Sequence, residues 1–210
     1  MLPRMRLLFV GDSVTAGFRL VDGTAYPHLA ADRLADRGLA VDVLVDALDG
    51  ADTGYVLRRF DRMVTSHDPD FVVVALGLND ARPPQGRTPV PVERFRSNLA
   101  ALVDRVLSLG ARCAVQTPTP RFDEPVAAAS TTRDCMSPYV AAVRETARAL
   151  RLPLIDVYPV LLSEPRLETL VPDGVHPTAA GHELLADVVT QELLAIVRPA
   201  PSASNQRARR

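Results

Sequence analysis

A serine at the end of a short apolar run is the first residue whose position suggests chemistry. The segment "LLFVGDSVTAGF" (residues 7–18) places Ser13 directly after Gly11 and Asp12, with small residues following. Two interpretations of this corner are open, a structural turn before a helix or a nucleophile presented on a tight turn. A serine nucleophile needs a general base within hydrogen-bond reach and a third group that orients the base. The second interpretation therefore requires partners elsewhere in the chain.

Candidate partners stand far along the chain, in the segment "VPDGVHPTAAGHELL". Asp173 and His176 are three residues apart, so on a tight turn both side chains can face the same side. The Asp173 carboxylate would accept the Nδ1–H of His176 and leave Nε2 to take the proton of Ser13. We therefore expect these three residues to form a catalytic triad.

Acyl transfer also needs hydrogen-bond donors directed at the oxyanion that develops on the substrate. Asn79 in "ALGLND" offers a neutral side-chain amide at the end of an apolar run. Gly50 in "DALDGADT" offers a backbone N–H that substrate can approach closely, because glycine has no Cβ. The backbone N–H of Ser13, at the start of a helix, would be the third donor.

Four short blocks in this chain are similar to those of the SGNH (GDSL-type) hydrolase family. They read "GDS" at 11–13, "DGADT" at 49–53, "GLND" at 77–80 and "DGVH" at 173–176. The blocks stand in the family's order, and the resemblance extends over about residues 6–195. Each block alone is a weak signal, because turns rich in glycine, asparagine and aspartate are common. Their joint order makes the resemblance specific.

The resemblance implies a serine hydrolase that cleaves carboxylic esters through an acyl-enzyme. By position it implies that Ser13 is the nucleophile, His176 the base and Asp173 the orienting carboxylate. It also implies an oxyanion hole formed by Ser13, Gly50 and Asn79. The second block departs from the family's pattern, because Asp46 stands where many members have asparagine. We expect Gly50, not Gly54, to be the glycine donor.

Short apolar runs alternate with longer amphipathic segments along the chain. The expected strands are rich in Val, Leu and Ile, as is typical of parallel strands buried on both faces, and cover 6–11, 40–46, 70–77, 112–117 and 152–157. The expected helices cover 25–37, 53–66, 92–109, 137–150 and 178–197. This alternation predicts a three-layer α/β/α fold with a five-stranded parallel sheet in flavodoxin-like order.

The predicted fold constrains where the candidate residues lie. In such sheets, ligands bind beyond the carboxyl ends of the strands, which places Ser13, Gly50 and Asn79 at one edge. Two loops, at 81–91 and 118–136, are expected to shape the substrate pocket. We expect a single hydrolase domain over 1–197 and a disordered, polar tail over 198–210.

Composition argues against several other classes of protein. The net charge of −1 gives no reason to expect a nucleic-acid partner. No apolar run approaches the roughly 20 residues of a membrane helix or the roughly 7–15 of a signal-peptide core, so we expect a cytoplasmic protein without membrane insertion. Four scattered histidines and the absence of a glycine-rich phosphate loop predict neither a metal nor a cofactor.

The sequence therefore predicts a serine esterase that acts on small or short-chain acyl esters, with acetylated sugars among the candidates. Two alternatives stay open at this level. An acyltransferase would pass the same acyl group to an acceptor other than water, and a binding module would use the fold without catalysis. The natural substrate and the oligomeric state are not determined by these patterns.

Overall fold

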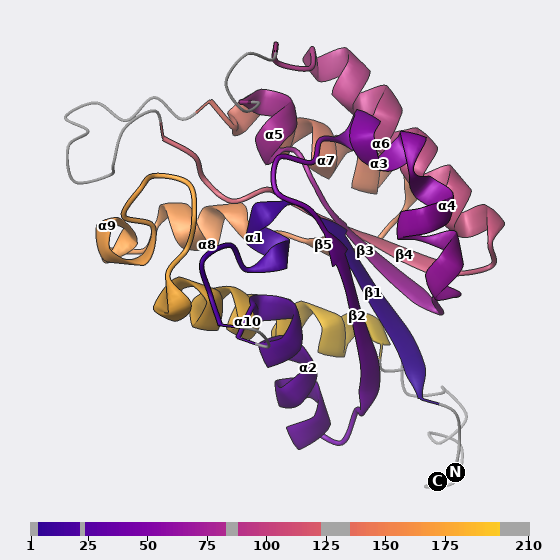
Figure 1. The fold of residues 1–210 in the computed structure, drawn as a ribbon, viewed down its shortest axis with the longest axis horizontal. Helices are drawn as coiled ribbons and strands as arrows, with labels where there is room; N and C mark the ends of the chain where they lie inside the picture. Colours follow the sequence, from indigo (N-terminus) through magenta and orange to yellow (C-terminus); the bar gives the residue numbers. More distant parts are fainter. Residues whose placement is uncertain (1–3, 22–23, 83–87, 123–134, 198–210) are drawn as a thin grey trace, which may run out of the picture.

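A computed structural model describes residues 4–21, 24–82, 88–122 and 135–197 of the chain. Its five parallel strands form one sheet in the order β2-β1-β3-β4-β5 (Figure 1). The strands are β1 (Met5–Gly11), β2 (Val41–Ala47), β3 (Phe71–Ala75), β4 (Arg112–Gln116) and β5 (Leu154–Ile155). This order is the flavodoxin-like arrangement predicted from the sequence.

Helices cover both faces of the sheet. Figure 1 shows α2 (Tyr26–Asp36) and α10 (Ala179–Val197) on one face, with α6 (Val92–Ser108) and α7 (Ser137–Leu150) on the other. All four lie within two residues of their predicted bounds. The apolar stripe of α6 packs into the core, where Phe95, Leu99, Leu102, Val103 and Val106 are buried. The three predicted layers are therefore confirmed.

The predicted helix over 53–66 is wrong as a continuous element. The segment instead forms α3 (Thr53–Arg58), α4 (Phe60–Met63) and a 3₁₀ turn η1 (Thr65–His67). Arg59 departs from helical backbone angles, with φ −118° and ψ 18°. Phe60 and Met63 are buried after this break, so burial of the apolar side chains outweighs the continuity of the helix.

Two predicted strands are also shorter than expected. The predicted strand over 152–157 pairs with β4 only through Leu154 and Ile155. The predicted strand over 70–77 ends at Ala75, because Gly77 has a φ of 130° and leaves the extended conformation. Its chain then enters a short helix at the edge of the sheet.

Short helices follow several strands, and of these only a helix that starts at Ser13 was predicted. They are α1 (Ser13–Ala16), α5 (Leu78–Ala81), α8 (Tyr158–Leu162) and α9 (Leu167–Leu170). Each has only one turn or slightly more, so none leaves a recognisable apolar period in the sequence. Two of them, α1 after β1 and α5 after β3, begin beside adjacent strands and bring their residues to the same edge.

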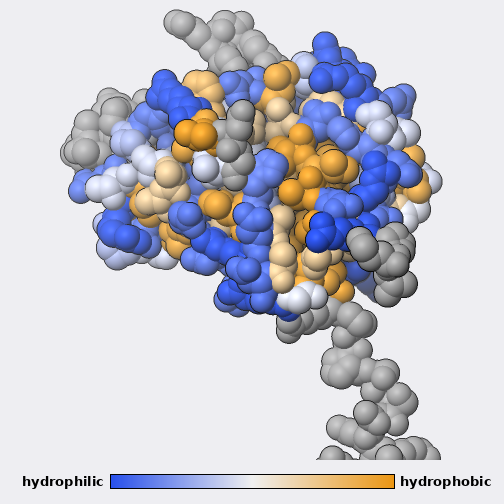
Figure 2. Space-filling view, turned by 60° about the horizontal axis from the view of Figure 1, so that its bottom comes forward, coloured by the Kyte–Doolittle hydropathy of each residue, from blue (hydrophilic) through white to orange (hydrophobic). Residues whose placement is uncertain are grey.

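The surface has a mixed polarity. Figure 2 shows one face, on which hydrophobic residues form patches among hydrophilic ones. Several large hydrophobic side chains are exposed, namely Val21, Leu48, Leu107, Leu109, Leu150, Val160 and Leu162. Within the described ranges, no helix combines the length and the hydropathy that crossing a membrane requires.

Candidate active site

The turn between β1 and α1 holds Ser13 at the carboxyl edge of the sheet. Asp12 caps α1 by accepting a hydrogen bond from the N–H of Val14 at 3.0 Å. The hydroxyl group of Thr15 would clash with any Cβ at Gly11, at 2.2 Å, so the turn requires glycine there. Ser13 is thus the first residue of a tightly held helical turn.

His176 reaches Ser13 from the loop that precedes α10. The Nε2 atom of His176 lies 3.2 Å from the Oγ atom of Ser13, and its Nδ1 atom lies 2.9 Å from a carboxylate oxygen of Asp173. The other carboxylate oxygen accepts hydrogen bonds from the backbone N–H groups of Val175 and His176. The structure therefore joins the three predicted side chains in one hydrogen-bonded chain.

The environment of this chain favours an ionised Asp173. Burial alone would raise the pKa of its carboxyl, but the hydrogen bonds from His176 and Val175 outweigh it and hold the pKa below its usual value. The guanidinium of Arg19 lies 3.5 Å from the same carboxylate. An anionic Asp173 can accept a hydrogen bond from Nδ1–H of His176 and so hold the imidazole in one orientation.

An aromatic ring that the sequence analysis did not single out also positions the imidazole. The ring centroids of Phe18 and His176 are 4.6 Å apart. The guanidinium of Arg19 lies over the Phe18 ring, 4.9 Å from its centroid. Phe18 follows the serine block by only a few residues, but its spacing carries no signal of this contact. The contact restricts the movement of the imidazole ring.

Asn79 and Gly50 line the same cleft as Ser13. The side-chain amide of Asn79 donates one hydrogen bond to the carbonyl of Ala51 at 3.0 Å, which leaves its second N–H for another acceptor. Gly50 has a φ of 75°, in the left-handed region that favours glycine. Gly54 lies in α3, outside the cleft lining.

A buried carboxylate joins the segments that hold Gly50 and Asn79. Asp80 accepts hydrogen bonds from both the backbone N–H and the hydroxyl group of Thr53, and Asn98 of α6 donates to the same hydroxyl at 3.0 Å. Burial raises the pKa of Asp80 to about 6, although the Thr53 bonds favour the ionised form. This connection fixes α5 against the start of α3.

The cleft in front of Ser13 has a volume of about 360 Å³. Its lining combines apolar and polar side chains, and consists of Ser13, Phe18, Asp49, Gly50, Asn79, Arg121, Val175 and His176. Pockets of this size are within the range that small ligands occupy. A second cleft, of about 310 Å³, shares Phe18 and His176 with the first.

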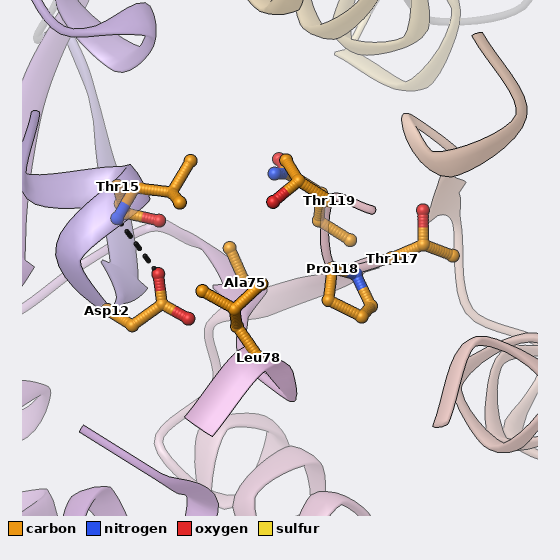
Figure 3. A pocket seen from close by; sticks show the side chains of 9 residues that line it. Asp12, Thr15, Ala75, Leu78, Thr117, Pro118 and Thr119 are labelled. Atoms are coloured by element: carbon orange, nitrogen blue, oxygen red, sulfur yellow. Dashed lines mark hydrogen bonds between the residues drawn. The ribbon is translucent and has the colours of Figure 1, made fainter. Parts of the chain in front are cut away.

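A much smaller cavity, of about 10 Å³, lies behind the Ser13 turn. In Figure 3, Asp12 and Thr15 of the turn face Pro118 and Thr119 across this cavity. It is too small for an ester, so it does not compete with the cleft as a substrate site. Asp12 is 3% exposed, and burial raises the pKa of its carboxyl to about 7.

The thiol of Cys113 is buried and lies outside the cleft lining. Burial raises the pKa of the Cys113 thiol to about 12, which makes it unreactive as a nucleophile. Within the described ranges, no three His, Cys, Asp or Glu residues gather as a potential metal site. Parts of the predicted pocket loops, 83–87 and 123–134, and the whole predicted tail lie outside the described residues.

Comparison with known proteins shows which family the chain resembles. The model of the GDSL-like lipase/acylhydrolase family matches residues 9–184. An arylesterase of Vibrio mimicus is 26% identical over 189 residues, which are 90% of this chain and 88% of that protein. A thioesterase 1/protease 1/lysophospholipase L1 of Escherichia coli is 25% identical over 193 residues, which are 91% of this chain and 84% of that protein.

A solved structure shares the fold over almost the whole chain. The lipase/acylhydrolase from Enterococcus faecalis superposes with a TM-score of 0.78 and 26% sequence identity, covering 94% of this chain and 100% of that chain. The matched family residues include the serine turn, both oxyanion candidates and the Asp173–His176 loop. The chain therefore belongs to the GDSL-like lipase/acylhydrolase family of hydrolases.

Proposed function

We propose that this protein hydrolyses small carboxylic esters through an acyl-enzyme formed on Ser13. Its family and its similarity to an arylesterase support ester hydrolysis as the reaction. The single observation behind the mechanism is the hydrogen-bonded chain from Asp173 through His176 to Ser13. Nucleophile, base and orienting group stand in the order that acyl transfer requires.

The first step forms the acyl-enzyme. The Oγ atom of Ser13 attacks the ester carbonyl carbon while its proton passes to Nε2 of His176. The negative charge that develops on the carbonyl oxygen is stabilised by the N–H groups of Ser13 and Gly50 and by the side-chain amide of Asn79. The tetrahedral intermediate then collapses, and the alcohol leaves with the proton from His176.

The second step releases the acid. His176 takes a proton from water, the resulting hydroxide attacks the acyl carbonyl, and Ser13 leaves with that proton. The same oxyanion donors stabilise the second tetrahedral intermediate. Acyl transfer to an alcohol other than water would start from the same acyl-enzyme, so a product assay must quantify acid and new ester separately.

The dimensions of the cleft support a small substrate. A volume of about 360 Å³ accommodates a short acyl group with a small alcohol. Phe18 and Val175 supply apolar surface near the nucleophile.

The cytoplasmic location and the single domain over 1–197 stay predictions.

Active-site labelling combined with a series of esters tests the proposal. A fluorophosphonate probe should label the wild-type protein but not the Ser13→Ala variant. The control is Ser108→Ala, which removes an exposed serine of α6 and should still be labelled. Turnover of para-nitrophenyl acetate and butyrate should be lost only in Ser13→Ala. Equal labelling or equal turnover in Ser13→Ala would refute the assignment.

A further inference from the structure

Arg121 is a cation in the substrate cleft that the proposed reaction does not use. It lines the cleft together with Ser13, Asn79 and His176 and is partly buried. The backbone N–H of its neighbour Phe122 donates to the carbonyl of Gly174 at 2.9 Å. This bond ties the Arg121 segment to the loop that holds Asp173 and His176.

The guanidinium of Arg121 is not neutralised by the part of the chain that the structure describes. No carboxylate there forms an ion pair with it, whereas Arg19 pairs with Asp173 and Arg144 pairs with Asp156. Burial is the largest effect and lowers the pKa of Arg121. The charge of Arg82 acts in the same direction, whereas Cys135, Asp12 and Asp173 act in the opposite direction without reversing the shift. A partly desolvated cation without an ion pair among the described residues is costly, and an anionic ligand would offset this cost.

Among the described residues that line the cleft, Asp49 is the one acidic side chain. Asp49 lies next to Gly50 and is exposed, so solvent screens its charge. Among the described residues, it forms no ion pair with Arg121. The cleft thus presents a positive group and a negative group that do not neutralise each other, and the positive one is the more desolvated.

We propose that Arg121 is a specificity residue that binds a carboxylate carried by the ester substrate. This inference rests on the proposed function, since it places the bound ester in front of Ser13. A planar guanidinium can donate two parallel hydrogen bonds to one carboxylate, which orients the ester as well as binding it. The carboxylate can belong to the acyl group or to the alcohol, and the two are separated by experiment.

Two matched pairs of esters distinguish these sources. Para-acetoxybenzoate and para-acetoxybenzamide carry the charged or neutral group on the alcohol, and monomethyl adipate and methyl adipamate carry it on the acyl group. The measured quantity is the ratio of kcat/KM for each carboxylate over that for its amide. We expect a preference for the carboxylate in at least one pair, lowered about 10- to 100-fold by Arg121→Gln and partly retained by Arg121→Lys.

Two further variants test whether the effect is local. Arg148→Gln removes the same charge from an exposed position on α7 and should leave the ratio unchanged. Asp49→Asn removes the negative charge from the cleft and should raise the ratio. A ratio that is unaffected by Arg121→Gln in both pairs, while the amides are still hydrolysed, would overturn the role of Arg121 alone.

A binding measurement separates this role from turnover. In the Ser13→Ala background, calorimetry should detect para-acetoxybenzoate binding that weakens by a similar factor when Arg121→Gln is added. Thermal melting establishes that each variant is folded. Failure of the wild-type protein to hydrolyse any of the four esters or para-nitrophenyl acetate would instead contradict the proposed function.

Discussion

The Nε2 atom of His176 lies 3.2 Å from the Oγ atom of Ser13, although the two residues are 163 positions apart in the chain. Packing of α10 against α2 makes this approach possible. The buried imidazole of His182, in α10, accepts a hydrogen bond from the backbone N–H of Tyr26, at the start of α2. This bond fixes the beginning of α10, and therefore the preceding His176 loop, beside the Ser13 turn.

The side-chain amide of Asn79 should contribute mainly to the transition state. Replacing it with alanine removes one oxyanion donor, and we expect kcat to fall by about 10²-fold with little change in KM. Steady-state kinetics with para-nitrophenyl acetate measures both constants. The fluorophosphonate probe should still label Ser13 in this variant, and a kcat within about twofold of wild type would contradict the assignment.

Asp173→Asn should reduce kcat strongly and change the free energy of unfolding only slightly. The amide cannot stabilise a protonated His176 as a carboxylate does, so we expect a loss on the order of 10³- to 10⁴-fold. Asp156→Asn is the matched control, because that carboxylate binds Arg144 and lies outside the cleft lining. Equal losses of kcat in the two variants would show that Asp173 has only a structural role.

The hydroxyl of Thr53 should support catalysis through Asp80 and α5. Thr53→Val keeps the shape of the side chain but removes a donor to a buried carboxylate, which costs about 1–3 kcal/mol of unfolding free energy. Because α5 also holds Asn79, we expect a lower kcat as well. Thr190→Val, in α10, removes a buried hydroxyl elsewhere and should lower stability without lowering kcat.

Urea unfolding and ester kinetics on both threonine variants provide these measurements. The comparison is informative because both changes remove one buried hydroxyl from a threonine. If kcat falls equally in both variants, the loss follows general destabilisation rather than displacement of Asn79. If neither changes stability, the hydrogen bonds of Thr53 and Thr190 contribute little to folding.

Protonation of Asp12 should make stability depend on pH. Burial raises the pKa of Asp12 from 3.8 to about 7, so the folded protein binds this proton more tightly than the unfolded chain does. Its contribution to stability is complete below about pH 3.8 and is lost as the pH rises through about 7. The slope reaches about −1.4 kcal/mol per pH unit.

The Asp12→Asn variant isolates this contribution. Its amide oxygen can still accept the hydrogen bond from the N–H of Val14, but it has no proton to lose. The free energy of unfolding, measured in urea between pH 5 and pH 8, should therefore fall less steeply than in the wild-type protein. Parallel curves for the two proteins would show that Asp12 does not titrate in this range.

The sequence by itself determined the fold class and the identities of the candidate site residues. Apolar runs of β-branched residues identify buried parallel strands, and the period of α6 identifies its buried face, because both patterns are local consequences of burial. The first three motif blocks stand at the ends of β1, β2 and β3, so the edge they share follows from the sheet order. The break at Arg59 and the one-turn helices α5, α8 and α9 were missed, since such short elements leave no period.

Only the tertiary structure decided which further side chains meet around the predicted Ser13, His176 and Asp173. The contact of Phe18 with His176, the bond from Thr53 to Asp80 and the place of Arg121 in the cleft join segments that are distant in sequence. The reason is physical: these contacts depend on how helices pack across the sheet and on where loops return. No local pattern of residues encodes such distances, so the residue types were predictable while their geometry and burial were not.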